Sequence, residues 1–197
     1  EWQWAWFVPH DVDGLVELMG GRDAFIGKLD SLFTADSKLE GESTSVDISG
    51  LIGQYAHGNE PSHHIAHLYN YVGQPWRTQE IVDEVLHTLY FNNPDGLSGN
   101  EDCGQMSAWY ILNAMGFYQV CPGKPVYSIG RPLFNEATVH LKDGKSFKVI
   151  AHNNSRDNKY VRSIVLNGNK LETPFFTHQD IVDGGTLELT MGSEPLK

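Results

Sequence analysis

The apolar residues of this chain change their spacing part-way along it, and that change constrains the fold more than any other feature. Before Tyr127 they recur every three or four positions, as Ile81 and Val85 do, which is the spacing of an amphipathic helix. From Tyr127 onward they alternate with polar residues, which is the spacing of a strand. The sequence therefore predicts a mainly α part, residues 1–122, followed by a β part, residues 123–197.

About five helices are expected in the α part, joined by loops of unequal length. Asp11 is the expected N-cap of the first, which ends at Gly20. The second places Phe25 and Leu29 on one apolar face. The other three are expected around Ile65–Val72, Glu80–Tyr90 and Asp102–Gly116.

Two tight turns mark hairpins in the β part. Asp143-Gly144 separates two alternating runs, and Asn167-Gly168 follows a third. Thr177 opens a short capped turn before the last run. The expected strands are residues 138–141, 146–150, 160–166 and 186–190. Together these signals predict a small antiparallel β tail.

The balance of charge narrows the class of partner. Lys and Arg total 14 against 25 Asp and Glu, a formal net charge of −11, which repels a phosphate backbone or an anionic membrane surface. The sequence therefore predicts no nucleic-acid partner. An acidic chain with 11% aromatic residues suits neutral sugars or cations, although a solvated acidic surface is the ordinary explanation of such a charge.

The two cysteines and the apolar runs give little further information about the function of the chain. Cys103 and Cys121 cannot form a disulfide framework and lack the paired spacing of a metal site, so whether they are bridged stays open. No run approaches the roughly 18 apolar residues that span a bilayer, so no membrane span is expected in this chain.

A carboxylate pair stands where a turn-rich loop meets a helix. In the stretch Asn92–Tyr110 the first half favours tight bends and the second half is helical, with Glu101 and Asp102 at the junction. Such a junction holds an acidic side chain rigidly yet within reach of a substrate. The alternative is that Asp102 merely caps the helix.

A second polar cluster precedes the third helix. His63 and His67 lie one helical turn apart beside Glu60, which invites a zinc interpretation, but the HExxH pattern is absent and hydrogen-bonded packing is favoured. Asn59 and Glu60 offer the hard oxygens that Ca²⁺ prefers, with capping as the alternative. An EF-hand is excluded for residues 95–102, because Leu97 occupies a ligand position.

Three long strings resemble a known family. They are VPHDVDGLVELMGG, AHGNEPSHHIAHLYNYVGQPWRTQ and PDGLSGNEDCGQMSAWYILNAMGFYQVCPG, and with YSIGRPLF and SIVLNGNKL in the tail they cover nearly the whole chain. They closely resemble the calcium-dependent exo-acting α-mannosidases of glycoside hydrolase family 92.

The resemblance implies a fold and a setting. The family combines an N-terminal β-sandwich with an (α/α)6 barrel, so the chain is expected to hold the later helices of the barrel and the C-terminal strands. The aromatic segment at residues 1–8 is expected to be buried, as if cut from a larger protein whose N-terminal part is missing here. The full-length protein is expected to be secreted, periplasmic or on the cell surface.

The resemblance also implies an inverting hydrolysis, in which a base activates water on one face of the sugar. Asp102 matches the general base of the family. Asn100 stands where a second Asp can occur, and it can orient the water or the sugar hydroxyls. The proton donor is a Glu a few residues before a string that Trp2-Gln3-Trp4 matches. Glu1 is too close to match it, so the isolated chain is expected to be inactive.

Calcium in this family is similar in role to a Lewis acid that grips hydroxyls of the terminal mannose. Asn59 and Glu60 are assigned to the ion or to these hydroxyls. The residues expected to line the sugar site, with simple burial as the alternative, are His63, His64, Trp76 and Gln105. The expected substrate is a mannose-containing glycan such as an N-glycan or a mannan.

A second class of function stays open at this point. The chain could instead be a carbohydrate-binding or structural module in which the β tail acts and the helices only pack. The sequence does not distinguish the linkage between the terminal mannose and its neighbour.

Overall fold

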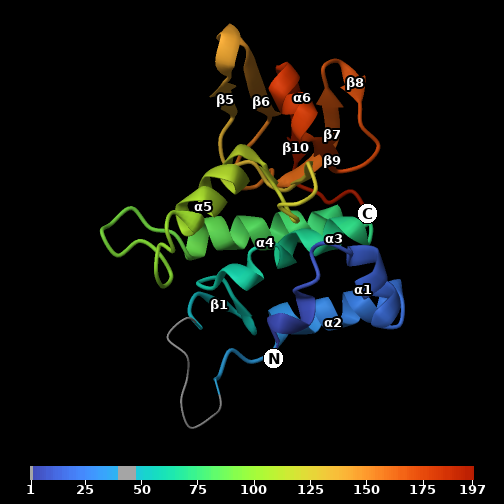
Figure 1. The fold of residues 1–197 in the computed structure, drawn as a ribbon, viewed down its shortest axis with the longest axis vertical. Helices are drawn as coiled ribbons and strands as arrows, with labels where there is room; N and C mark the ends of the chain where they lie inside the picture. The colour runs from blue at the N-terminus through green and yellow to red at the C-terminus, as the bar shows by residue number, and fades with distance from the viewer. Residues whose placement is uncertain (1, 40–47) are drawn as a thin grey trace.

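The computed structural model describes residues 2–39 and 48–197. Within this described part, no helix is long and apolar enough to cross a membrane. The described helices form no closed barrel (Figure 1), so the (α/α)6 architecture stays a prediction. The α-helices are α1 (Val12–Leu18), α2 (Arg22–Thr34), α3 (Leu68–Tyr71), α4 (Pro75–Thr88), α5 (Gln105–Met115) and α6 (His178–Asp183).

The strands form three sheets. The largest has the order β5-β6-β10-β7-β8, a second has the order β3-β4-β9, and a third is the pair β1-β2. The strands are β1 (Leu51–Ile52), β2 (Tyr55–Ala56), β3 (Phe117–Tyr118), β4 (Val126–Ile129), β5 (Glu136–His140), β6 (Ser146–His152), β7 (Tyr160–Leu166), β8 (Asn169–Lys170), β9 (Phe175–Thr177) and β10 (Gly185–Gly192).

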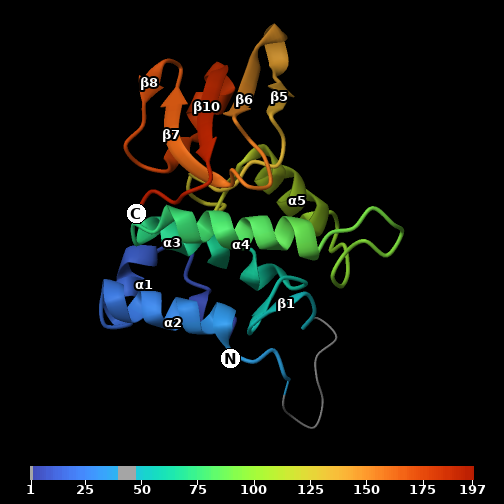
Figure 2. The same ribbon diagram turned by 180° about the vertical axis from the view of Figure 1, so that it is seen from behind.

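Helix α4 separates the two halves of the molecule. In Figure 1 it crosses the middle, with α1, α2 and the β1–β2 pair on one side and the five-stranded sheet with α6 on the other, and Figure 2 shows the same arrangement from behind. The buried residues accordingly form two clusters, one around Trp6, Phe25 and Trp109 and the other around Phe147 and Leu187. The division at residues 122 and 123 stays a prediction.

The first two helices agree with the sequence. The Asp11 side chain caps α1 by accepting a hydrogen bond from the Gly14 N–H at 3.0 Å. In α2 the expected apolar face is buried, including Phe25 and Leu29. The capping residue and the helical spacing of apolar residues were sufficient to predict these two helices, because both act within about one helical turn.

The third and fourth helices differ from expectation. In place of one helix around Ile65–Val72, the chain makes two 3₁₀ turns, η2 (Glu60–Ser62) and η3 (Ile65–His67), before the short α3. Pro61 lies in the first of these turns, where proline is tolerated because the first N–H groups of a helical turn have no partner within it. Helix α4 begins at Pro75 instead of Glu80, because proline suits the first helical turn.

Both predicted hairpins are confirmed. Strands β5 and β6 pair antiparallel around η4 (Lys142–Gly144), and β7 pairs with β8 around the second turn. Asp143 and Asn167 adopt φ of 63° and 51°, the left-handed values that such turns require.

The tail is a mixed sheet, so the prediction of a purely antiparallel tail is wrong. Strand β10 pairs antiparallel with β7 but parallel with β6. Between β6 and β10 the chain makes β7, β8, β9 and the capped helix α6, which is the long connection that parallel neighbours need. Thr177 and Asp180 form the capping box of α6, where the sequence predicted only a capped turn.

The aromatic N-terminal segment is only partly buried. Trp6 is fully buried in η1 (Trp4–Trp6), whereas Trp2, Trp4 and Phe7 are exposed, so the expected burial of this segment is wrong for three of its aromatic residues. A single 3₁₀ turn points its side chains in different directions, so only one of them reaches the core.

Polar contacts join α4 to the β part. The Gln79 Oε1 atom accepts a hydrogen bond from the Val161 N–H at 3.1 Å, and the Tyr160 hydroxyl donates to Glu80 at 2.7 Å. One turn further on, Asp83 and Arg131 form an ion pair at 2.8 Å. Helix α4 is thereby tied to strand β7 and to the segment that follows β4.

Candidate active site

The loop before α5 has an unusual backbone at Asp102. Asp102, Cys103 and Gly104 have consecutive φ values of 53°, 56° and 94°. For the two residues that are not glycine, this left-handed conformation costs on the order of 1–3 kcal/mol each and persists only where surrounding structure enforces it. Such strain is frequent where a side chain is held for chemistry, which makes Asp102 a candidate functional residue.

Glu101 supports the start of α5. The helix begins at Gln105 with Gly104 in the N-cap position, and the Asp102 carbonyl oxygen accepts a hydrogen bond from the Gln105 N–H at 3.1 Å. The Glu101 carboxylate accepts hydrogen bonds from the Ser107 N–H at 2.9 Å and the Ser107 hydroxyl at 2.8 Å. The two adjacent carboxylates therefore have different surroundings.

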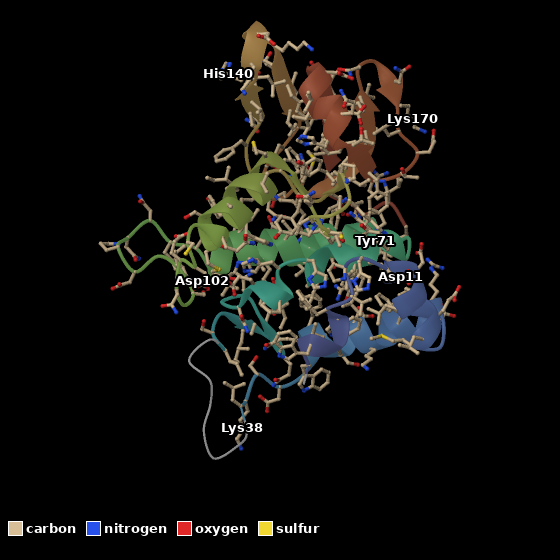
Figure 3. The ribbon with its side chains drawn as sticks, in the orientation of Figure 1. Asp11, Lys38, Tyr71, Asp102, His140 and Lys170 are labelled. Atoms are coloured by element: carbon tan, nitrogen blue, oxygen red, sulfur yellow. The ribbon has the colours of Figure 1, made fainter. Side chains whose placement is uncertain are left out.

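Four of the predicted site residues line one hollow of ≈ 410 Å³. It lies between the N-terminal segment, the η2 region and α5, and Asp102 is close enough that its charge acts on His63. Figure 3 shows Asp102 in the loop that leads to α5. The predicted residues in the lining are Glu60, His63, His64 and Gln105; the others are Phe7, Pro9, Pro61, Tyr118, Gln119, Val120 and Pro122.

His63 is a neutral, fixed part of this wall. Its Nε2–H donates to the His57 carbonyl oxygen at 2.9 Å, and its Nδ1 accepts from the Gln105 amide at 3.0 Å. The same amide donates to the Tyr118 hydroxyl at 3.2 Å. Burial lowers the pKa of His63 to about 4, although the His57 carbonyl and the charge of Asp102 act in the opposite direction.

The other two histidines of the cluster are also committed to hydrogen bonds. His64 Nε2 donates to the Trp6 carbonyl oxygen at 2.8 Å. His67 donates from Nε2 to Asn113 at 2.9 Å and accepts at Nδ1 from Ser128 at 3.0 Å. Residues 2–39 and 48–197 contain no group of three or more His, Cys, Asp or Glu that could hold a metal ion. The packing that the sequence favoured over zinc is what the structure shows.

The histidine network makes stability depend on pH. Burial lowers the pKa of His67 to about 4, below the ordinary value near 6.5, so the unfolded chain binds more protons between these values. The contribution of His67 to stability is therefore fully present above about pH 6.5. The free energy of unfolding falls as the pH decreases toward 4. Lowering the pH from 7 to 5 is expected to remove about 2 kcal/mol through His67 alone.

Urea unfolding at pH 7 and pH 5 checks this expectation. His67→Gln should reduce the difference in unfolding free energy between the two pH values. His140→Gln is the matched control, because His140 is exposed near the tip of the β5–β6 hairpin (Figure 3) and should leave the difference unchanged. An equal difference in all three proteins would contradict the assignment.

Two glycines bring the loop that precedes Asp102 beside the segment of Asn59. A side chain on Gly58 would place its first carbon 2.5 Å from the Ser98 carbonyl oxygen, and one on Gly99 would place it 3.3 Å from the Gly58 carbonyl oxygen. Only glycine permits so close an approach of the two backbones. The segment leading to Asp102 therefore lies against the segment that carries Asn59 and Glu60.

The donor atoms of Asn59 and Glu60 fit part of a calcium site. Asn59 precedes η2 but its side chain makes no capping hydrogen bond, so the capping alternative is wrong for it. Glu60 is exposed and lines the hollow, which leaves a carboxylate oxygen accessible there. Two hard oxygens supply a minority of the six to eight that Ca²⁺ takes, and the others would come from water, sugar hydroxyls or further residues.

The sequence profile of the glycosyl hydrolase family 92 catalytic domain matches residues 1–193. The chain belongs to this family. It is similar to the family GH92 alpha-mannosidase BT3965 of Bacteroides thetaiotaomicron, solved in complex with mannoimidazole, with 42% identity and a TM-score of 0.93. That match covers 99% of this chain and 25% of the mannosidase.

Two further relatives agree with this membership. The family GH92 inverting mannosidase BT2199 of the same organism is 45% identical with a TM-score of 0.84, over 98% of this chain and 27% of its own. An uncharacterized secreted glycosidase of Arthroderma benhamiae is 32% identical over 196 residues, which is 98% of this chain and 23% of that protein. This family 92 chain thus spans about a quarter of the length of these relatives.

Four residues predicted for the site do not line the hollow of this family 92 chain: Asn59, Asn100, Asp102 and Trp76. Trp76 is half-buried in the first turn of α4 and does not line it. Asn100 is exposed in the loop before Asp102 and does not line it either. The roles of these residues stay predictions.

Sequence reasoning missed Phe7 and Tyr118, which line the hollow. Tyr118 lies in β3 after the C-cap of α5, and its hydroxyl reaches Gln105. No local pattern singles it out. Phe7 belongs to the aromatic string at the start of the chain, for which the sequence predicted burial and no functional role.

A larger hollow of ≈ 560 Å³ borders the loop that carries Glu101 but contains fewer of the predicted site residues. It contains Glu101, whose carboxylate is bound to Ser107, together with the rings of Tyr90 and Phe91. Because the smaller hollow brings four of the predicted site residues together, that smaller hollow is the better candidate for the reaction.

Proposed function

We propose that the protein containing this chain is an inverting, calcium-dependent exo-α-mannosidase that removes terminal α-mannose from glycans such as N-glycans or mannans. The observation that carries the proposal is the hollow that Glu60, His63 and Gln105 line, with the strained, left-handed Asp102 three residues before Gln105 in the chain. Membership of family 92 and the similarity to solved mannosidases support it. The similarity to a glycosidase named as secreted supports a place outside the cytoplasm.

In this proposal Asp102 is the general base. It takes a proton from the water that attacks the anomeric carbon, on the face opposite the departing oxygen. The neutral His63 does not compete for that proton, and its hydrogen bond to the Gln105 amide holds Gln105 in the wall of the hollow. Asn100, at the exposed turn before the base, orients the water or a hydroxyl.

Asn59 and Glu60 would hold calcium in this proposal. When bound, Ca²⁺ supplies Lewis-acid polarisation of the sugar hydroxyls and favours a distorted ring. Glu60, which lines the hollow, would hold the ion there.

The general acid of the proposal comes from outside the described residues. Of the residues that line the hollow, only Glu60 carries a carboxylate, and it is assigned to calcium. Glu1 lies outside the residues that the structure describes. We therefore expect the 197-residue chain by itself to be inactive on natural mannosides.

The test is hydrolysis of a panel of α-linked mannobioses by the full-length protein, followed by NMR. Release of β-mannose before mutarotation supports an inverting mannosidase. Release of α-mannose first would contradict inversion. Binding of mannosides without any hydrolysis would favour a carbohydrate-binding module instead.

Calcium removal tests the metal assignment. Chelation of the full-length protein should abolish turnover, and added Ca²⁺ should restore it. Glu60→Gln is expected to weaken calcium binding by about tenfold or more, because the ion loses a charged oxygen ligand. Isothermal titration with Ca²⁺ measures the change directly.

Glu84→Gln is the matched control for the calcium titration, since Glu84 is exposed on α4 and lies outside the hollow. It should titrate like the unmodified protein. A calcium affinity that is the same in Glu60→Gln as in the control would remove Glu60 from the site.

A further inference from the structure

The Gln105 side chain has one polar atom left for a ligand. Its amide carries two N–H hydrogens and one carbonyl oxygen, Oε1. The amide nitrogen donates to the His63 Nδ1 atom at 3.0 Å and to the Tyr118 hydroxyl at 3.2 Å. Within residues 2–39 and 48–197 no group donates a hydrogen bond to Oε1, and that oxygen is not buried. A ligand in the hollow that Gln105 lines would therefore meet a hydrogen-bond acceptor.

A backbone carbonyl decides which end of this amide stays available. The His57 carbonyl oxygen can only accept a hydrogen bond, so the His63 Nε2 atom, 2.9 Å away, carries a proton. His63 is 2% exposed and neutral, so its Nδ1 atom has a lone pair and no proton. Only the N–H end of the Gln105 amide can bond to that lone pair. The reversed amide would place two acceptors against each other, which is unfavourable in a buried wall.

His63 is itself fixed by the core. Its ring lies 4.9 Å from the His57 ring, and its carbonyl oxygen accepts a hydrogen bond from the indole of the fully buried Trp109 at 2.9 Å. The direction of the Gln105 amide is therefore set before a ligand binds. Little conformational entropy is lost when a ligand uses an acceptor that is already in place.

The rest of the lining suits a ligand that donates hydrogen bonds and carries no negative charge. Among the described residues that line the hollow there is no Lys or Arg, and the Glu60 carboxylate accepts hydrogen bonds when it is ionised. The hydroxyls of a neutral sugar are such donors.

We propose that Gln105 accepts a hydrogen bond from one hydroxyl of the bound mannose, and that His63 is the positioning residue that keeps its carbonyl oxygen available for that hydroxyl. The inference rests on the proposed function. It predicts selectivity at a single hydroxyl. A site that hydrogen-bonds a hydroxyl rejects an analogue that cannot form this bond, because the polar group of the site is then left without a partner.

Inhibition of the full-length protein by mannose and by deoxyfluoro mannoses tests this selectivity. Each analogue has one hydroxyl replaced by fluorine, which cannot donate a hydrogen bond. For one analogue the inhibition constant, Ki, measured against an activated α-mannoside, should be about tenfold or more above that of mannose. In Gln105→Met this ratio of Ki values should fall close to one, because methionine keeps the length of the side chain but has no oxygen. The ratios for the other analogues should not change.

His63→Leu separates positioning from packing. The Gln105 amide then loses its acceptor at Nδ1 and can turn, so the ratio for the same analogue should fall about threefold or more. A purely structural role would weaken mannose and every analogue alike. Circular dichroism shows whether each variant is folded, and Gln105→Met alone decides the outcome if His63→Leu is not.

Gln179→Met is the matched control. Gln179 is an exposed glutamine on α6 whose amide donates to Asp183 at 2.7 Å, and it does not line the hollow. This variant should keep all the ratios of the unmodified protein.

Three results would overturn the proposal while the proposed function stands. They are analogues that all bind as well as mannose, an unchanged ratio in Gln105→Met or in folded His63→Leu, and weaker Ca²⁺ binding by Gln105→Met, which would make Oε1 a ligand of the ion. Failure of the unmodified protein to hydrolyse the activated α-mannoside or to bind mannose would overturn both.

Discussion

Asp102→Asn in the full-length protein is expected to lower turnover by about 10²–10⁴-fold and to leave the fold intact. Asparagine has nearly the same shape and is one of the residues that tolerates left-handed backbone, so the φ of 53° can be kept. It cannot take a proton from water. The loss should therefore appear in kcat as well as in kcat/KM for α-mannobiose.

The adjacent Glu101 offers a matched control. Glu101→Gln removes a carboxylate one residue away, but that carboxylate is bound to Ser107 at the start of α5. We expect this variant to keep its activity within a few-fold and to lose about 1 kcal/mol of stability. Activity of Asp102→Asn above about a tenth of the original would show that Asp102 is not the base. Circular dichroism and thermal unfolding of both variants separate loss of chemistry from loss of fold.

Arg131→Met is expected to lower the free energy of unfolding by about 3–5 kcal/mol. Arg131 is almost fully buried, and its Nε lies 2.8 Å from the Asp83 carboxylate, which is also largely buried. The guanidinium further donates to the Ser155 carbonyl oxygen at 2.9 Å and to the Pro132 carbonyl oxygen. Methionine fills much of the same volume but leaves the Asp83 charge without its nearest partner. Arg156 lies 3.7 Å from the same carboxylate oxygen but is largely exposed, so the cost is mainly that of a buried charge that has lost its closest partner.

Urea unfolding of the variant measures this loss, with Lys148→Met as the control. Lys148 forms an ion pair with Glu136 at the same distance of 2.8 Å, but both side chains are exposed, and such pairs contribute about 1 kcal/mol or less. Adding Asp83→Leu to Arg131→Met should recover part of the stability, because the orphaned charge is then gone. Similar losses in Arg131→Met and Lys148→Met would show that burial of the pair contributes little.

Features set by neighbouring residues were predicted well from the sequence. The Asp11 cap, the buried face of α2 and the turns at Asp143 and Asn167 all agree with the structure. Each depends on hydrogen bonds or side-chain spacing within a few residues, which the order of the sequence specifies. The long strings that resemble family 92 also identified the family correctly, because they are contiguous in the chain.

Helix ends and sheet partners were predicted less well. The parallel pairing of β6 with β10 depends on how the intervening strands and α6 fold back, which no local pattern of β10 contains. The Glu101 carboxylate contacts Ser107, six residues along the chain, through a turn with positive φ values at Asp102 and Cys103 that was not predicted. The parallel pairing is a consequence of long-range packing.

The sequence by itself determined the helical and strand periods, the hairpin turns, the family and most candidate residues, since these depend on local chemistry or on contiguous motifs. Only the tertiary structure decided which candidates share a site. It places Phe7, Glu60, Gln105 and Tyr118 around one hollow, although they come from four separate segments, and it leaves Trp76 outside. The physical reason is that a site is formed by contacts between distant segments. Those contacts follow from the burial of two apolar clusters and from the close approach of backbones such as Gly58 and Gly99.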